Sequence, residues 1–85
     1  MSAEVYVCML YDVGGPCLVI SGDVESGEFS EGAVGRTVGG KKFTVVKIEK
    51  EGRQISRVTE KQRVNIFTKN ATRADIRIGD VVYID

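Results

Sequence analysis

The chain has 85 residues, which suffices for one small domain with one thin core and excludes a nucleotide-binding domain joined to a substrate domain. Twelve Lys and Arg balance twelve Asp and Glu, so the net charge is zero and the chain as a whole is not a strongly basic nucleic-acid binder. The absence of His excludes Ser-His-Asp triads and His metal ligands, and two Cys are too few for a four-cysteine zinc site.

The neutral total hides an uneven charge distribution. Residues 1–35 hold six acids and no base, whereas residues 36–85 hold twelve bases and six acids, so the two parts carry charges of −6 and +6. The folded chain therefore either has two faces of opposite charge or neutralises its charges in space. No apolar run approaches the roughly 20 residues of a membrane span, and the N-terminus lacks the basic and apolar regions of a secretory signal. We expect a cytoplasmic protein without a membrane partner.

Short β-forming runs separated by turn residues dominate the first part of the chain. Residues 5–11 form an unbroken run, and residues 12–16 interrupt it with glycines, which allow positive φ, and a proline, which donates no hydrogen bond. Residues 17–25 resume strand character up to a Ser-Gly turn. A short third strand is predicted at residues 33–37.

Alternation of apolar and polar residues is clearest in the second part of the chain. Residues 42–50 predict a central strand with solvated ends, with Val46 and Ile48 on the same face, and residues 53–58 predict its return strand after a Glu-Gly turn. Residues 63–69 alternate cleanly, residues 70–75 are polar with room for a single helical turn, and residues 81–84 form a last strand.

The whole chain, residues 1–85, is therefore predicted to be a single all-β domain. No segment has the apolar period of an amphipathic helix. Six or seven short strands at this spacing favour a small barrel, closed or partly closed, because closure removes exposed sheet edges. The ten glycines suit tight corners between strands. We expect Gly22 and Gly27 at such a corner, and Ile76 and Ile78 in the core.

Several motifs, in order, carry a family resemblance. Residues 22–27 read Gly-Asp-Val-Glu-Ser-Gly and are followed by Phe29 and Gly32, and residues 75–82 read Asp-Ile-Arg-Ile-Gly-Asp-Val-Val. Between them, residues 43–48 and 64–66 have matching strand character. This order resembles the second domain of translational GTPases, the β-barrel that follows the G domain in elongation factor Tu and its relatives. The resemblance covers residues 13–84.

The resemblance implies an elongation factor Tu domain 2-like barrel, which in that family contacts ribosomal RNA and, in elongation factors, the aminoacyl end of tRNA. The chain has no Gly-x-x-x-x-Gly-Lys-Ser/Thr phosphate loop and no Asn-Lys-x-Asp motif, so we expect no nucleotide, no cofactor and no enzymatic activity. The family often carries a base at or after the first motif. Asp23, Glu25 and Ser26 stand there in this chain, which argues against RNA contact through that turn.

Basic residues are the strongest functional signal in the sequence. If they converge on one face, they form an electrostatic footprint for RNA; the alternative is solvated strand ends paired with the acidic part. The six aromatic residues are spread along the chain, which suits a core better than a base-stacking platform. The candidate RNA- or partner-binding residues are Arg36, Lys41, Lys42, Lys61, Arg63, Lys69 and Arg73.

The cysteines and the acidic residues of the first turn are expected to have structural roles. Cys8 and Cys17 are expected to be reduced core residues, and no His is present to activate a catalytic thiol. The acids of residues 23–31 match no calcium loop, so we expect a solvated turn and no metal.

Two functions follow as hypotheses. The first is a non-enzymatic, translation-related module that contacts RNA, a ribosomal component or another ribonucleoprotein through its basic second half. The alternative is a protein-interaction or self-assembly module with no nucleic-acid role, in which the acidic region of one copy meets the basic region of another to give a homodimer.

Overall fold

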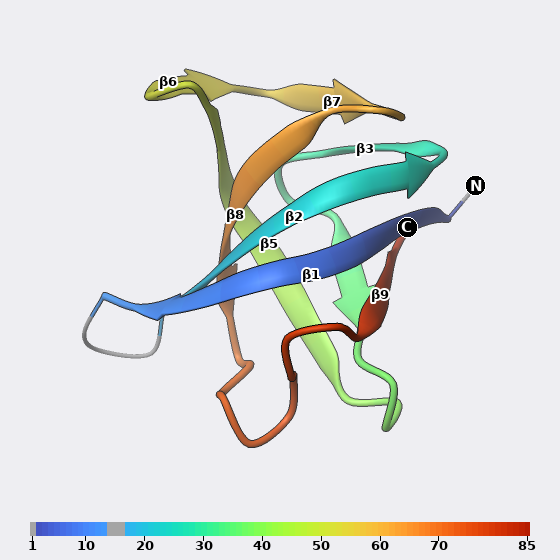
Figure 1. The fold of residues 1–85 in the computed structure, drawn as a ribbon, viewed down its shortest axis with the longest axis vertical. Helices are drawn as coiled ribbons and strands as arrows, with labels where there is room; N and C mark the ends of the chain where they lie inside the picture. Colours follow the sequence, from blue (N-terminus) through green and yellow to red (C-terminus); the bar gives the residue numbers. More distant parts are fainter. Residues whose placement is uncertain (1, 14–16) are drawn as a thin grey trace.

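The computed structural model describes residues 2–13 and 17–85, and this part of the chain is all-β (Figure 1). Residues 42–50, 63–69 and 81–84 form strands with the predicted bounds. The strands are β1 (Ala3–Asp12), β2 (Cys17–Ser26), β3 (Glu28–Ser30), β4 (Val34–Arg36), β5 (Lys42–Lys50), β6 (Arg53–Ile55), β7 (Arg57–Thr59), β8 (Arg63–Lys69) and β9 (Val81–Ile84).

The main sheet closes on itself. Its strand order is β4-β9-β1-β2-β8-β5-β6, and β4 also pairs with β5, so six strands form a closed barrel and β6 is an additional strand beside β5. All the pairings are antiparallel. β3 and β7 form a separate two-stranded sheet, drawn beside β6 at the top of Figure 1. The prediction of a small all-β barrel is confirmed.

One of the predicted strands is wrong. Residues 53–58 do not make one return strand, because the chain breaks at Ser56 into β6, which pairs with β5, and β7, which pairs with β3.

Residues 70–75, where the sequence has room for a single helical turn, contain a hydrogen-bonded turn at residues 73–75. The Asp75 N–H donates to the Thr72 carbonyl at 2.9 Å, and this three-residue spacing is that of a single 3₁₀ turn.

The barrel interior is filled by alternate side chains of the long strands. In β8, alternate residues Val64, Ile66 and Thr68 are buried, and the Thr68 hydroxyl donates to the Leu18 carbonyl at 2.7 Å. In β5 the pairing register with β8 shifts between Val45 and Lys47. This irregularity leaves Val46 exposed while Ile48 is buried, so the two do not share a face as expected.

The glycine of the first motif serves packing rather than a corner. Gly22 lies within β2, where a Cβ atom would come 2.5 Å from the backbone oxygen of Tyr6 on β1. Gly22 therefore lets β1 and β2 approach closely. Gly27, by contrast, lies just after β2 with a φ of 75°, as a corner requires.

The closing motif turns the chain into β9. Ile76 is fully buried, but Ile78 is exposed, so its predicted core position is wrong. The reason is a turn at residues 78–79, in which Gly79 has a φ of 95° and donates its N–H to the Val7 carbonyl at 2.8 Å. Asp80 fixes this turn by accepting the Arg77 N–H at 2.9 Å.

Candidate nucleic-acid interface

The seven candidate basic residues are all exposed, but they fall into two groups. Arg63 and Lys69 begin and end β8, and a strand rises about 3.3 Å per residue, so their backbones lie about 20 Å apart. Lys61 lies next to Arg63. The seven residues therefore do not share one end of the barrel, and the alternative of a single basic face, which the sequence left open, does not apply to all of them.

The larger group lies at the end of the barrel where β4 turns into β5 and β8 ends. Arg36 is opposite Lys42 in the β4–β5 register, and Lys69 is opposite Thr44 in β5. Figure 1 shows that the connections after β4 and after β8 lie at the same end of the molecule. We call the group at this end the hairpin-end group, and it comprises Arg36, Lys41, Lys42, Lys69 and Arg73.

Three members of the hairpin-end group form ion pairs with acidic side chains. Lys41 Nζ is 3.0 Å from Asp75 Oδ2, and the hydrogen bond from Lys41 holds the pKa of the Asp75 carboxyl below its ordinary value. Arg73 Nε is 3.1 Å from Asp12 Oδ2, and its Nη2 donates to the Leu10 carbonyl. Arg36 lies 3.9 Å from the Asp85 carboxylate.

Lys42 and Lys69 are in none of the ion pairs within residues 2–13 and 17–85. They are therefore the members of the hairpin-end group whose charge is uncompensated by a close partner.

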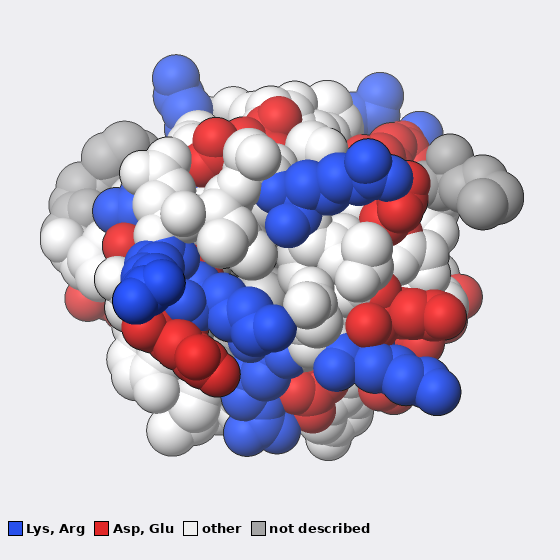
Figure 2. Space-filling view, turned by 90° about the horizontal axis from the view of Figure 1, so that it is seen from above, with Lys and Arg blue, Asp and Glu red and all other residues white. Residues whose placement is uncertain are grey.

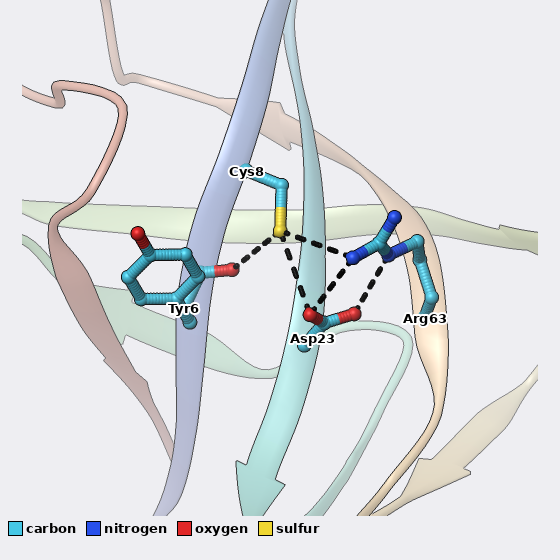
Figure 3. Close-up of polar contacts among 4 residues, drawn as sticks. All are labelled: Tyr6, Cys8, Asp23 and Arg63. Atoms are coloured by element: carbon cyan, nitrogen blue, oxygen red, sulfur yellow. Dashed lines mark hydrogen bonds and ion pairs between the residues drawn. The ribbon is translucent and has the colours of Figure 1, made fainter.

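At the other end, Arg63 belongs to a cluster that spans three strands (Figure 3). Arg63 donates two hydrogen bonds to Asp23, from Nε to Oδ1 at 2.7 Å and from Nη2 to Oδ2 at 3.0 Å. The Cys8 thiol lies 3.6 Å from Asp23 Oδ2 and 3.7 Å from Arg63 Nη2. The cluster ties β1, β2 and β8 together on the outside of the barrel.

The electrostatics of this cluster stabilise the charged pair and the neutral thiol. The hydrogen bond from Arg63 lowers the pKa of Asp23, and the same contact raises the pKa of the guanidinium. Burial, and then the negative charge of Asp23, raise the pKa of the Cys8 thiol. Since the thiolate is the nucleophilic form, this environment disfavours nucleophilic chemistry at Cys8.

Charge pairing joins the acidic and basic parts of the sequence. Asp12, Asp23 and Glu28 from the first part pair with Arg73, Arg63 and Arg57 from the second. On the face shown in Figure 2, basic side chains border acidic ones instead of forming two separate regions. Of the two arrangements that the sequence allowed, the structure has the one in which opposite charges neutralise each other in space.

A groove lies on the outside of the sheet formed by β1, β2, β8 and β5. Its volume is about 560 Å³, and Lys61 and Arg63 are among its lining residues, together with Lys50 and Tyr11. A second depression, of about 510 Å³, is lined by Glu28, Glu31 and Asp85, with Arg57 as its one base among the described residues. The first is the better match for a polyanion.

Three aromatic residues are not where the sequence analysis places them. Tyr6, Tyr11 and Tyr83 are exposed, whereas Phe29 and Phe43 are buried in the core. Each tyrosine lies on the outer side of its strand and is next in sequence to a buried apolar residue, such as Val5 beside Tyr6 and Leu10 beside Tyr11. Even spacing along the sequence does not distinguish these two sides of a strand.

The cysteines are free thiols as predicted, but both are only partly buried and neither is in the core. In the described part of the chain, no group of three or more His, Cys, Asp or Glu side chains is placed to hold a metal ion. Among residues 2–13 and 17–85, no helix has the length and hydropathy of a transmembrane span.

Comparisons with solved structures support the fold. The chain superposes over its full length on apo translation elongation factor SelB from Methanococcus maripaludis, with a TM-score of 0.88 and 13% identity. The fold is that of a translation-GTPase barrel domain. The bacterial selenocysteine-specific elongation factor EF-Sec matches 94% of the chain (TM-score 0.84, 18% identity), and GDP-bound aIF5B from Aeropyrum pernix matches 98% (TM-score 0.80, 13% identity).

These similarities are structural and partial. The chain covers 19% of the SelB chain and 14% of the EF-Sec and aIF5B chains, so it corresponds to one domain of each. No protein-family model matches the sequence, and the search of curated proteins found no match.

Proposed function

We propose that the chain is a non-enzymatic, translation-related module that contacts RNA or a ribonucleoprotein through basic residues of its second half. The observation that carries this proposal is the full-length likeness to the barrel of a translation elongation factor, at a TM-score of 0.88. A translation-related role also makes the cytoplasm the expected location.

The hairpin-end group is the proposed contact surface for phosphates. Lys42 and Lys69 bring exposed charge without an acidic partner among the described residues. The acids paired with Arg36 and Arg73 are more than half exposed, and exposed ion pairs are weak. Phosphate oxygens can therefore replace these carboxylates at little cost.

The proposal is tested by fluorescence anisotropy with a labelled, folded tRNA transcript over a series of salt concentrations. We expect affinity to fall steeply with salt, since each phosphate contact releases counterions. Lys42→Glu should weaken binding and reduce the slope of log affinity against log salt by about 1. Arg53→Glu, which makes the same charge change on β6, is the control and should have a smaller effect. Undetectable binding of wild type at low salt would disprove the proposal.

A protein-interaction role is the alternative, and one observation favours it. Tyr6, Ile78 and Tyr83 are exposed apolar or aromatic side chains on or next to β1 and β9, which are neighbouring strands. Self-assembly between acidic and basic regions has less support, because ion pairs inside one molecule already use those charges. Sedimentation at high protein concentration and low salt tests this version, which requires a dimer under those conditions.

A further inference from the structure

The groove on the outer sheet has a regular construction. In the strand register, Met9 of β1, Ser21 of β2, Asn65 of β8 and Glu49 of β5 stand side by side in one row. Neighbouring strands lie about 4.8 Å apart, so this row extends over about 14 Å. Ser21, Asn65 and Glu49 line the groove, as does Tyr11, two residues beyond Met9 on the same strand. The part of the row that lines the groove, from Ser21 to Glu49, covers two strand spacings, or about 10 Å.

Tyr11 supplies an exposed aromatic ring at this groove. Its exposed fraction is 47%. Among the described residues that line the groove, Tyr11 is the one that is aromatic. Phe67, on the same outer face, is already occupied because Lys47 Nζ lies 4.5 Å from the centre of its ring. An exposed aromatic ring at a polar groove is a suitable surface for a nucleobase, because every base has a π-face.

Neutral polar groups beside the ring can pair with the edge of a base. Ser21, Gln62 and Asn65 line the groove, and their hydroxyl and amide groups both donate and accept hydrogen bonds. The amide oxygen of Gln62 accepts the Thr59 N–H at 3.2 Å, so the NH₂ group of Gln62 is the part available to a ligand. In a duplex the Watson–Crick edges of the bases are used in pairing, whereas a single strand leaves them free to bond with these side chains.

The charges of the groove suit a short stretch of phosphates. Arg63 is neutralised by Asp23, and Glu49 is neutralised by Lys47 at 3.1 Å. Lys50 and Lys61 then outnumber Glu51 among the lining residues. Two lysines can contact two phosphates, which predicts a shallow salt dependence with a slope of about −1.4 for a single strand.

We propose that this groove binds single-stranded RNA, with one base stacked on Tyr11 and adjacent phosphates on Lys50 and Lys61. This inference rests on the proposed RNA-binding function and assigns it a second site, separate from the hairpin-end group. The groove would hold an unpaired segment while the hairpin-end group contacts the backbone of a folded region.

The test uses a fluorescein-labelled eight-nucleotide RNA of mixed sequence in an anisotropy titration at low salt. Tyr11→Ala should weaken binding about tenfold, whereas Tyr11→Phe, which keeps the ring, should stay within about twofold of wild type. Tyr83→Ala is the matched control, because Tyr83 has an exposed fraction of 45% and lies on β9. It should bind like wild type.

The outcomes separate the two proposals. If wild type binds RNA but Tyr11→Ala binds equally well, the groove assignment is wrong and the broader RNA-binding function stands. If wild type binds neither the short single strand nor a folded tRNA at low salt, the proposed function itself is wrong. Circular dichroism of each variant distinguishes lost binding from lost folding. If Tyr11→Ala unfolds, Lys61→Glu carries the test, because Lys61 lines the groove and is proposed to contact a phosphate. It should weaken binding of the short RNA, and binding equal to wild type would overturn the groove assignment.

Discussion

Gly22 shows how one residue sets the distance between two strands. A Cβ atom at this position would collide with the backbone oxygen of Tyr6, which cannot rotate away. We expect Gly22→Ala to lower the free energy of unfolding by about 1–3 kcal/mol, the usual cost of overpacking. Gly39→Ala is the control, because its nearest neighbour atom is 3.9 Å away, and it should change stability by less than about 0.5 kcal/mol. Equal urea-unfolding midpoints for the two variants would contradict this account.

The ion pair between Asp23 and Arg63 should make the free energy of unfolding depend on pH in the acidic range. Because Arg63 lowers the pKa of Asp23 in the folded state, the pair stabilises the fold above the unfolded-state pKa of about 3.9. This stabilisation is lost as the pH falls through the lower, folded-state pKa. Wild type should therefore be more stable than Asp23→Asn at pH 7, and the difference should shrink toward pH 2.

Urea unfolding of both proteins at several pH values measures this difference. Glu25→Gln is a matched control on the same strand, since Glu25 is exposed and lies in none of the ion pairs of the described residues. It should leave stability nearly unchanged. If the difference in free energy of unfolding between wild type and Asp23→Asn stays constant with pH, the ion pair between Asp23 and Arg63 does not have this role.

At the scale of elements, the turn between β5 and β6 holds Glu51 in a left-handed backbone conformation that a substitution could make more favourable. Glu51 and Gly52 have φ angles of 52° and 79°, as in a two-residue turn with both central residues left-handed. Asn adopts that conformation more readily than Glu. Glu51→Asn should therefore stabilise the fold by about 0.5 kcal/mol in thermal or urea unfolding. Glu60→Asn, in the exposed turn before β8, is the control, and a gain of the same size there would contradict the turn argument.

An element could be predicted where a run of residues with strand character lies between clear turn residues. β8 and β9 were predicted with their bounds, because seven and four residues with strand character lie between clear turn residues. β3 was missed, since it has three residues of which Phe29 alone is apolar. The exposure of Val46 could not be predicted, because it results from a register shift against β8, a partner far away in sequence.

The candidate site was less predictable than the fold. The sequence identified the seven basic residues, and all of them are exposed. Their division between two ends of the barrel follows from the strand register, which sequence spacing does not contain. The groove at Tyr11 was missed for a related reason: its lining comes from β1, β2, β5 and β8 and from two turns. The local sequence signal was the tyrosine that follows Leu10 at the end of the β-forming run of residues 5–11.

For the molecule as a whole, the structure explains how a chain with acidic and basic parts has no net charge. The barrel places β1 and β2 against β8 and β9, so first-part acids meet second-part bases at short distance. What remains for a ligand is a few uncompensated lysines, which include Lys42 and Lys69 at one end and Lys61 at the other. We therefore expect RNA affinity to depend on these particular positions rather than on total charge.

The most direct test of an RNA-binding role is chemical-shift mapping on the ¹⁵N-labelled protein, whose 85 residues are well suited to NMR. Titration with a tRNA that has a single-stranded end, at low salt, should shift the amides around Lys42 and Lys69 and those around Tyr11 and Lys61. Those of Val81 and Val82, which pair with β1, should move little. Spectra that do not change up to high RNA excess, or shifts confined to β1 and β9 around Tyr6 and Tyr83, would contradict the account and favour a protein partner.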